Sequence, residues 1–432
     1  MLASQIGLSA RPVPLVEENE WAVLRARFLL WSASFQVALG ELEPARQSRH
    51  EAGELLGRLE NQSLDVRRPQ AMYWQAEGDD QSDLKIKLEY YLRSAALYHE
   101  LEDGWREAGM LIWAGEFAMR LGDSSLALQY QLEALRLSRQ AGEPNTLLHS
   151  LRQITFLHFT LNENETARQF IQETTAFIEK VEEFPLRANT DMHLGMTLIW
   201  NGCFPEAIRR LENVLPLLRS LGYRYGVAYC SFCLGIGYVL NGEPALAENL
   251  LQSAFLETDR GGFLREAAGM LVILGMAALA QGHLAQAHEY FQEGINRYRR
   301  MQFAGELGMA LGGLALAQEL DGQPEAAQAA LIEALQIGVK HHNMATMLTC
   351  LTAMVYLLAH HGHLDTAMLV HRITLLKSVQ KNSRWYAGII GDEMVVQWGR
   401  LSEVHQSQID AAVSQHNPFS IIPDVIKQLT MD

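Results

Sequence analysis

The chain has 432 residues, 48% of them hydrophobic and 20% charged, a composition typical of a folded protein. Its formal net charge of −15 argues against a nucleic-acid backbone as the main partner. The longest apolar runs, 226–240 and 267–280, are shorter than the roughly 18 to 20 residues that span a bilayer, and residues 1–14 do not resemble a signal peptide. Four cysteines do not indicate a secreted disulfide framework. We therefore expect a soluble, cytoplasmic protein without nucleic-acid or membrane partners.

The N-terminal part is expected to be helical but irregular. Residues 1–19 are interpreted as a flexible segment that precedes the helices. Residues 20–102 are interpreted as two repeats, the first of them built around Gly40. The second contains Pro69 and the sequence Glu77-Gly78-Asp79-Asp80, which predicts a loop. The second repeat is therefore expected to be the irregular one.

The central part carries an internal repeat of 40 residues. Seven positions at this spacing hold a turn residue: Gly122, Asn162, Gly202, Gly242, Gly282, Gly322 and Gly362. An alanine stands five residues after each of them: Ala127, Ala167, Ala207, Ala247, Ala287, Ala327 and Ala367. Repeats of this length indicate stacked supersecondary units rather than one globular core. Residues 103–382 are therefore predicted to form seven regular units.

Each unit is predicted to consist of two helices joined at the turn residue. Residues 229–240 are apolar nearly all round, as is typical of a helix packed between neighbours. Asn241-Gly242-Glu243-Pro244 then combines a left-handed helix stop with a proline suited to the first turn of the next helix. Small residues recur seven positions before the turn, and we expect them to mark close helix crossings: Gly115, Thr155, Gly195, Gly235, Gly275 and Ala315.

The C-terminal part departs from the repeat. Residues 383–416 are interpreted as a degenerate unit that caps the stack, since the outer face of a terminal repeat meets water. Residues 417–432 form a tail with an apolar stripe made of Phe419, Ile421, Ile422, Val425, Ile426 and Leu429. Two interpretations of the tail stay open. It lies in the groove of its own chain as a plug that a partner displaces, or it is a capping helix or a frayed end.

At these spacings the sequence resembles the tetratricopeptide repeat. The residues that carry the resemblance are Leu234-Gly235-x-x-Tyr238, Gly242, Ala247 and Ala254, and the unit is longer than the usual length of about 34 residues. The resemblance implies an all-α fold, a right-handed α-solenoid of stacked helix–turn–helix repeats. It extends over most of the chain.

The long unit is also similar to the repeat arrays of two groups of proteins. One group is the sensor region of bacterial signal-transducing NTPase regulators, including the maltose-activator type with a LuxR-like DNA-binding end. The sequence Trp398-Gly399-Arg400-Leu401-Ser402 followed by a helix resembles the end of such sensor arrays. The other group comprises stand-alone adaptor arrays. Because this chain has no phosphate loop, the resemblance implies the array alone and not a complete regulator.

No motif in the sequence predicts catalysis. Besides the phosphate loop, the His-Glu-x-x-His and Gly-x-Ser-x-Gly patterns are absent. Cys230 and Cys233 form a Cys-x-x-Cys, but they lie on an apolar stretch without a second ligand pair, which favours core packing over zinc or redox work. His363 occupies the repeat position of His283, which favours exposed loop histidines over a metal site. We therefore predict no enzyme, no metal and no cofactor.

The register of the resembling family implies that the first helix of each unit lines the inside of the superhelix. The implied inward positions are rich in methionine and aromatic residues, which suits the apolar face of an amphipathic helix and not a carboxylate clamp. The predicted groove consists of Glu116, Arg120, His149, Arg152, Phe156, Phe159, Asn189, Met192, Met196, Trp200, Tyr229, Phe232, Ile236 and Met276. The alternative, that these residues are packed core, stays open.

The leading functional prediction is a non-enzymatic scaffold or adaptor that binds a helical or extended apolar segment of a protein or peptide. The alternative is a stand-alone sensing array that binds a small molecule and acts in a signalling or transcription-regulatory system. A sensor predicts an enclosed pocket with converging polar groups, whereas a scaffold predicts a long open groove. The sequence does not decide between them.

Overall fold

The computed structural model describes residues 15–38, 41–60, 64–121, 123–161, 163–180, 184–301, 303–341, 344–376, 378–416 and 419–430. Every element in these residues is helical, which confirms the predicted all-α repeat fold. The chain divides into two compact units, Met1–Ser150 and Leu151–Asp432, and each is described by itself. None of the described helices is long and apolar enough to cross a membrane.

Unit 1 is built from consecutive helix pairs. Its helices are α1 (Leu15–Ala38), α2 (Leu42–Leu59), α3 (Arg67–Asp80), α4 (Leu84–Glu100), α5 (Gly104–Arg120), α6 (Ser124–Ala141) and the first part of α7 (Pro144–Thr160). Each helix packs against the next in sequence, from α1 on α2 to α5 on α6. The loop expected at residues 77–80 is wrong, because these residues form the last turn of α3. Gly78 is buried there against Tyr91. This tertiary contact stabilises the turn and cannot be predicted from the local sequence.

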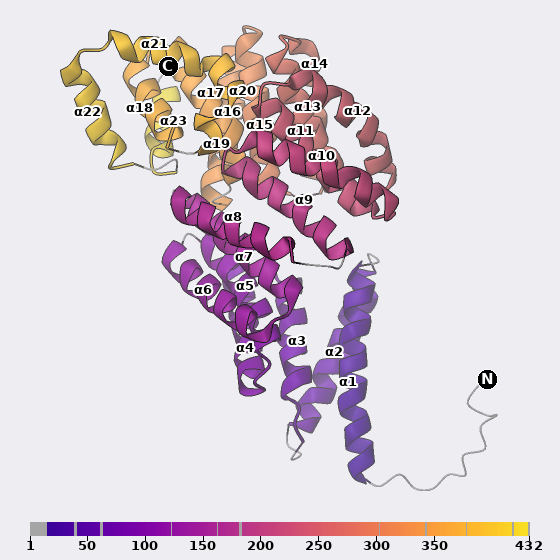
Figure 1. Cartoon of the computed structure of the whole chain (residues 1–432). Coiled ribbons are helices and arrows are strands. Elements are labelled where there is room, and N and C mark those ends of the chain that lie inside the picture. Colours follow the sequence, from indigo (N-terminus) through magenta and orange to yellow (C-terminus); the bar gives the residue numbers. More distant parts are fainter. Residues whose placement is uncertain are drawn as a thin grey trace. The chain divides into compact units, whose positions relative to one another are not determined.

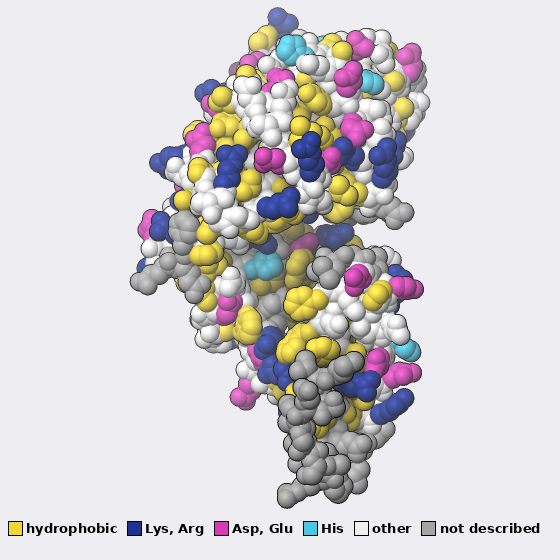
Figure 2. Space-filling model, turned by 90° about the vertical axis from the view of Figure 1, so that its right-hand side faces the viewer, with side chains coloured by type: hydrophobic (Ala, Val, Ile, Leu, Met, Phe, Trp, Pro, Cys, Tyr) yellow, Lys and Arg dark blue, Asp and Glu magenta, His cyan; other side chains and the backbone are white. Residues whose placement is uncertain are grey.

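Helix α1 is apolar on two opposite faces. Ala26, Leu30 and Ala33 are buried against the rest of the unit, whereas Phe28 and Phe35 are 67% and 74% exposed. Positions 28 and 30 are two residues apart and point to nearly opposite sides of a helix. Figure 2 shows hydrophobic side chains next to lysines and arginines on the side of the molecule where α1 lies. The helix therefore buries only one of its two apolar faces within the described residues.

Unit 2 continues the same pairing with nearly uniform helices (Figure 1). After the second part of α7 come α8 (Asn164–Ile178), α9 (Phe184–Trp200), α10 (Phe204–Ser220), α11 (Arg224–Leu240), α12 (Pro244–Arg260), α13 (Leu264–Ala280), α14 (Leu284–Arg300), α15 (Ala304–Leu320), α16 (Pro324–His341), α17 (Met344–His360) and α18 (Leu364–Thr374). The chain then forms α19 (Ser378–Lys381), α20 (Arg384–Tyr386), a π-helical turn η1 (Ala387–Gly391), α21 (Asp392–Arg400), α22 (Glu403–Val413) and α23 (Ile422–Leu429).

The 40-residue repeat consists of two half-units of 20 residues. From α9 to α15 each helix has 17 residues, and a three-residue turn follows each of α9 to α14. The predicted turn glycines adopt the left-handed conformation, for example Gly242 with φ 81° and Gly282 with φ 76°. A second set of left-handed glycines, Gly222 and Gly262, lies halfway between them at the joint between pairs. Glycine takes this conformation without the strain that a Cβ adds, so both kinds of joint are set by local sequence. Gly122 and Asn162 lie outside the described residues.

Within each pair, the small residue seven positions before the turn marks the closest approach, as predicted. A Cβ atom placed on Gly195, Gly235 or Gly275 would lie only 2.5 to 2.8 Å from a side chain of the second helix. These neighbours are Leu211, Leu251 and Phe291. Glycine at this position therefore allows the two helices of a pair to approach to contact distance, which fixes the face of the first helix that meets its partner.

The apolar tail does not lie on the first helices of the pairs. Its helix α23 buries Ile422, Val425 and Leu429 and packs against α16, which is the second helix of its pair. The plug hypothesis for this tail is therefore wrong, because its apolar stripe is already covered by α16. A different segment of the chain contacts the first helices.

Candidate functional site

Residues 378–391, which we call the strap, cross the carboxyl-terminal ends of α9, α11 and α13. The Asn382 side-chain amide donates to the carbonyl oxygen of Gly202 at 3.2 Å. The Arg384 side chain lies so close to Gly242 that a Cβ there would be 3.0 Å from it. The Trp385 indole is buried and its Nε1 donates to the carbonyl oxygen of Met276 at 3.0 Å. The strap thus contacts three first helices near their carboxyl-terminal ends, through an aromatic anchor, a packed arginine side chain and hydrogen bonds to two backbone carbonyls.

The strap is also fixed to the last two helices of the repeat. The buried Gln380 amide donates to the carbonyl oxygen of Leu348 in α17 at 2.7 Å. The Tyr386 hydroxyl lies 2.7 Å from Nδ1 of His371 in α18. Burial, with a smaller effect of Arg372, lowers the pKa of His371 to about 4, so this imidazole is neutral at physiological pH. The strap therefore connects the middle of the array to its last pair.

A row of half-buried polar and aromatic side chains lies on the amino-terminal and middle turns of the first helices α7, α9 and α11. We call Arg152, His193, Tyr225, Tyr229 and Phe232 the aromatic row. Arg152 Nη1 lies 3.1 Å from His193 Nδ1, and the His193 and Tyr229 rings are 5.3 Å apart. Tyr229 in turn contacts Tyr225 at 6.1 Å and Phe232 at 6.5 Å between ring centroids. The row therefore spans α7, α9 and α11 within unit 2.

The row lies on a side of the first helices that is turned away from the second helix of the same pair. Gly195 and Gly235 face the second helices of their pairs. His193 precedes Gly195 by two residues and Tyr229 precedes Gly235 by six, which rotates them by about 160° and about 120° around the helix. We call this side of α9, α11 and α13 the first-helix face. The strap contacts its carboxyl-terminal edge, and the aromatic row occupies positions nearer the amino-terminal ends and the middle of the helices.

Comparison with solved structures places this architecture among known folds. A Rap protein complexed with the competence and sporulation factor matches 95% of this chain and 99% of its own, with a TM-score of 0.53 and 11% identity. NprR in complex with its cognate peptide NprX matches 90% of this chain and all of its own, with a TM-score of 0.51 and 12% identity. Aspartyl phosphate phosphatase F from Bacillus subtilis matches 76% of this chain and 96% of its own, with a TM-score of 0.51 and 12% identity. The fold is a tetratricopeptide-type helical array. No family model matches the sequence, and no curated protein matches it.

The array distributes the sequence-predicted groove residues over both units. Glu116 and His149 are half-buried and Arg120 is exposed in unit 1. In unit 2, Met192, Ile236 and Met276 are buried. The half-buried members in unit 2 are Arg152, Phe156, Asn189, Met196, Trp200, Tyr229 and Phe232. The Phe159 side chain lies outside the described residues. The structure thus brings Arg152, Tyr229 and Phe232 together in the aromatic row, while the three buried members pack inside the array.

Sequence reasoning missed two parts of this site. His193 and Tyr225 belong to the aromatic row, and His193 stands four residues after Asn189, a spacing that places both on one helix face. The strap was interpreted as part of the last regular unit and of a terminal cap, but it contacts pairs far earlier in the sequence. The one sequence feature that could have indicated the strap is Trp385, a large aromatic residue in an otherwise degenerate repeat.

The two cysteine thiols near the row are held in their protonated form. Burial raises the pKa of the Cys230 thiol to about 12 and that of Cys233 well above its usual range. Both thiols of the Cys-x-x-Cys therefore stay protonated, whereas zinc binding and redox exchange use the thiolate. Among the residues that the structure describes, no three His, Cys, Asp or Glu side chains are grouped as metal ligands would be. The arrangement suits binding through aromatic surfaces, backbone acceptors and one guanidinium group.

Proposed function

We propose that this chain is a non-enzymatic adaptor or regulator that binds a peptide, or a short segment of a partner protein, on the first-helix face of unit 2. The strap is the observation that carries the proposal. It is a chain segment held on the edge of this face by a buried tryptophan and by hydrogen bonds to the backbone carbonyls of Gly202 and Met276. A ligand peptide can use the same chemistry on the adjacent part of the face.

The aromatic row indicates which side chains such a ligand carries. Tyr225, Tyr229 and Phe232 present aromatic surface for apolar side chains, and Tyr and Trp-like surfaces provide much of the energy of such interfaces. Arg152 adds a positive charge at the α7 end, which suits an acidic side chain. Two of the similar structures, a Rap protein and NprR, were solved with a bound factor or peptide, which supports peptide binding by this fold. The fold alone does not specify the ligand.

The test is a selection of displayed random peptides on the purified full chain, followed by affinity measurement by calorimetry. We expect saturable binders whose affinity falls at least tenfold, about 1.4 kcal/mol, in the Tyr229→Ala and Arg152→Ala variants. The matched control is Leu246→Ala on the second helix α12, where the side chain is 50% exposed. Circular dichroism checks that each variant stays folded. Peptides whose affinity is unchanged in both the Tyr229→Ala and the Arg152→Ala variant would contradict the proposal. A selection that yields no saturable binders would also contradict it.

A ligand-sensing function is the second candidate, and a cavity in unit 1 favours it. Its walls come from four helices of that unit, none of which carries the aromatic row.

A further inference from the structure

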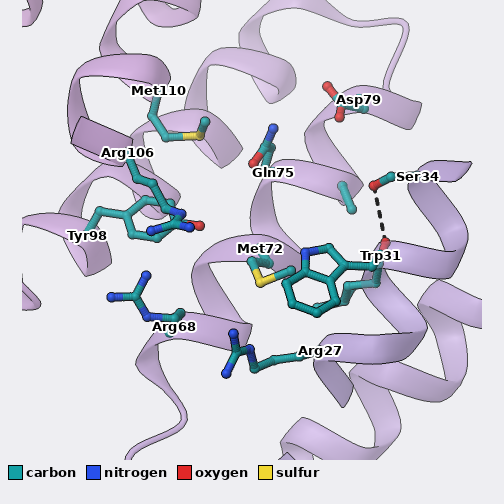
Figure 3. Close-up of a pocket in the computed structure, with 12 residues that line it drawn as sticks. Arg27, Trp31, Ser34, Arg68, Met72, Gln75, Asp79, Tyr98, Arg106 and Met110 are labelled. Atoms are coloured by element: carbon teal, nitrogen blue, oxygen red, sulfur yellow. Dashed lines mark hydrogen bonds between the residues drawn. The ribbon is translucent and has the colours of Figure 1, made fainter. Parts of the chain in front are cut away.

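Unit 1 contains a partly open cavity of about 200 Å³ between α1, α3, α4 and α5 (Figure 3). Three arginines from three different helices line it: Arg27 of α1, Arg68 of α3 and Arg106 of α5. Pockets for drug-sized ligands have volumes of roughly 300–1,000 Å³, so this one fits a smaller molecule. Three helices that are separated in the sequence thus each contribute one arginine to the lining of this cavity.

Two of these arginines share a single carboxylate. Arg68 Nη1 donates to Asp103 Oδ2 at 2.6 Å, and Arg106 Nη1 donates to the same oxygen at 2.8 Å. The Asp103 side chain is only 11% exposed, and it also accepts the backbone N–H of Arg106 as the cap of α5. One negative charge therefore balances two positive ones, and a net charge of about +1 remains at this wall.

The third arginine adds a further positive charge. Arg27 Nε is buried without a hydrogen-bond partner, and its guanidinium carbon lies 5.3 Å from the Trp31 ring centroid. A buried donor on a charged group that forms no hydrogen bond costs stability unless a ligand satisfies it. Burial raises the pKa of the Tyr98 hydroxyl, Arg106, Arg68 and Arg27 each act to lower it, and Asp103 acts to raise it, so all three arginines influence this hydroxyl. The arginine end of the cavity thus carries an excess of about two positive charges.

The remaining wall has a different character. Met72, Met110 and Leu30 contribute apolar surface, and the Trp31 indole, which is 52% exposed, forms part of the rim. Figure 3 shows Asp79 at the end of the cavity away from Arg27 and Arg68. Its carboxylate accepts a hydrogen bond from the Tyr91 hydroxyl and is not placed to neutralise the arginines. The cavity therefore has a cationic end and an apolar body.

We propose that this cavity binds a small organic phosphate monoester. Arg27, Arg68 and Arg106 hold the phosphate, and the organic group lies against Trp31 and the two methionines. A dianionic head matches the excess of two charges, and guanidinium groups bind phosphate oxygens through paired N–H donors. The site lies in unit 1 and is independent of the peptide site proposed for unit 2.

Calorimetry with phenyl phosphate on the full chain tests the assignment. We expect saturable binding that weakens at least tenfold in the Arg27→Gln variant and weakens as salt rises. The matched control is Arg25→Gln on the same helix, whose side chain is 66% exposed and pairs with Glu51 outside the cavity. Within the part of the chain that the structure describes, Arg27 forms no ion pair that its replacement would break, and thermal unfolding checks that the variant remains folded. Should Arg27→Gln unfold, Trp31→Ala gives a second readout through the organic group.

Three further small molecules test the roles of the apolar wall and of the phosphate group separately. Inorganic phosphate is expected to bind at least tenfold more weakly than phenyl phosphate, and equal affinity would overturn the role of the apolar wall. Phenylacetate, a monoanion, is also expected to bind more weakly, and tighter binding would overturn the phosphate head. Phenol, which is neutral, is expected not to bind. Absence of saturable phenyl phosphate binding, or equal binding by Arg27→Gln, would overturn the site itself.

Discussion

His371 illustrates how a single buried residue makes the stability of unit 2 depend on pH. Its imidazole is 2% exposed and contacts the Tyr386 hydroxyl, and its folded-state pKa of about 4 lies below the ordinary value of 6.5. Between these two pH values, His371 is protonated in the unfolded chain and neutral in the folded protein. The contribution to stability is therefore complete above pH 6.5 and is lost as the pH falls toward 4.

We predict that the His371→Asn variant loses this pH dependence. The free-energy difference between wild type and variant should shrink by about 2 kcal/mol from pH 7 to pH 5, because each pKa unit corresponds to about 1.36 kcal/mol. Denaturant unfolding of both proteins at the two pH values measures it. Other acid-sensitive groups are common to both proteins and cancel in the difference. A difference that stays constant with pH would show that His371 is protonated equally in both states.

At the scale of the helical element, the strap gives two turns at the same repeat position different surroundings. Gly242 and Gly282 occupy the same position in successive repeats, and both have a positive φ that disfavours any side chain. A Cβ at Gly282 would meet nothing within 4 Å, whereas one at Gly242 would press on Arg384. The repeat sequence treats these turns alike, and only the three-dimensional structure distinguishes them.

We predict that Gly282→Ala lowers the free energy of unfolding by about 1 kcal/mol, through backbone strain alone. Gly242→Ala should cost about 1 kcal/mol more, because the added methyl group must displace Arg384 from the end of α11. Chemical denaturation followed by circular dichroism compares the two variants under identical conditions. Equal costs would show that the strap does not press on the end of α11.

The helical elements were predictable to the extent that local sequence determines them. The spacing of Gly202 and Gly242, and the small residues at Gly195 and Gly235, predicted the pairs and their closest crossings. The turn of α3 at residues 77–80 was not predictable, because burial against Tyr91 overrides the loop tendency of Gly-Asp-Asp. Local patterns predict an element only where tertiary contacts agree with them.

At the scale of the whole molecule, the candidate site was predictable only in part. Family register placed Arg152, Tyr229 and Phe232 on the helix face that carries the aromatic row, since that face follows from the 3.6-residue period. The strap was not predictable from periodicity, because Trp385 and Met276 are 109 residues apart and share no repeat position. The phosphate cavity was missed for a similar reason, since its arginines come from three helices whose convergence no motif encodes.

We predict that Trp385→Ala affects regions far from its own position. In an array whose repeats contact only their neighbours, a substitution changes local stability near its site alone. Here hydrogen–deuterium exchange should rise in the strap and also at the carboxyl-terminal ends of α9, α11 and α13. The control is Leu256→Ala, a residue of α12 that is 55% exposed. Increased exchange confined to residues 378–391 would show that the strap does not stabilise the earlier pairs.

The position of the strap in the sequence also has a consequence for the order of events during synthesis. Met276 is translated 109 residues before Trp385, and Gly202 is translated 180 residues before Asn382. At roughly 5–20 residues per second, Trp385 follows Met276 after an interval of about 5–20 seconds. During that time α9, α11 and α13 can fold with their carboxyl-terminal ends uncovered. This edge of α9, α11 and α13 is therefore accessible on the nascent chain and covered by the strap on the finished one.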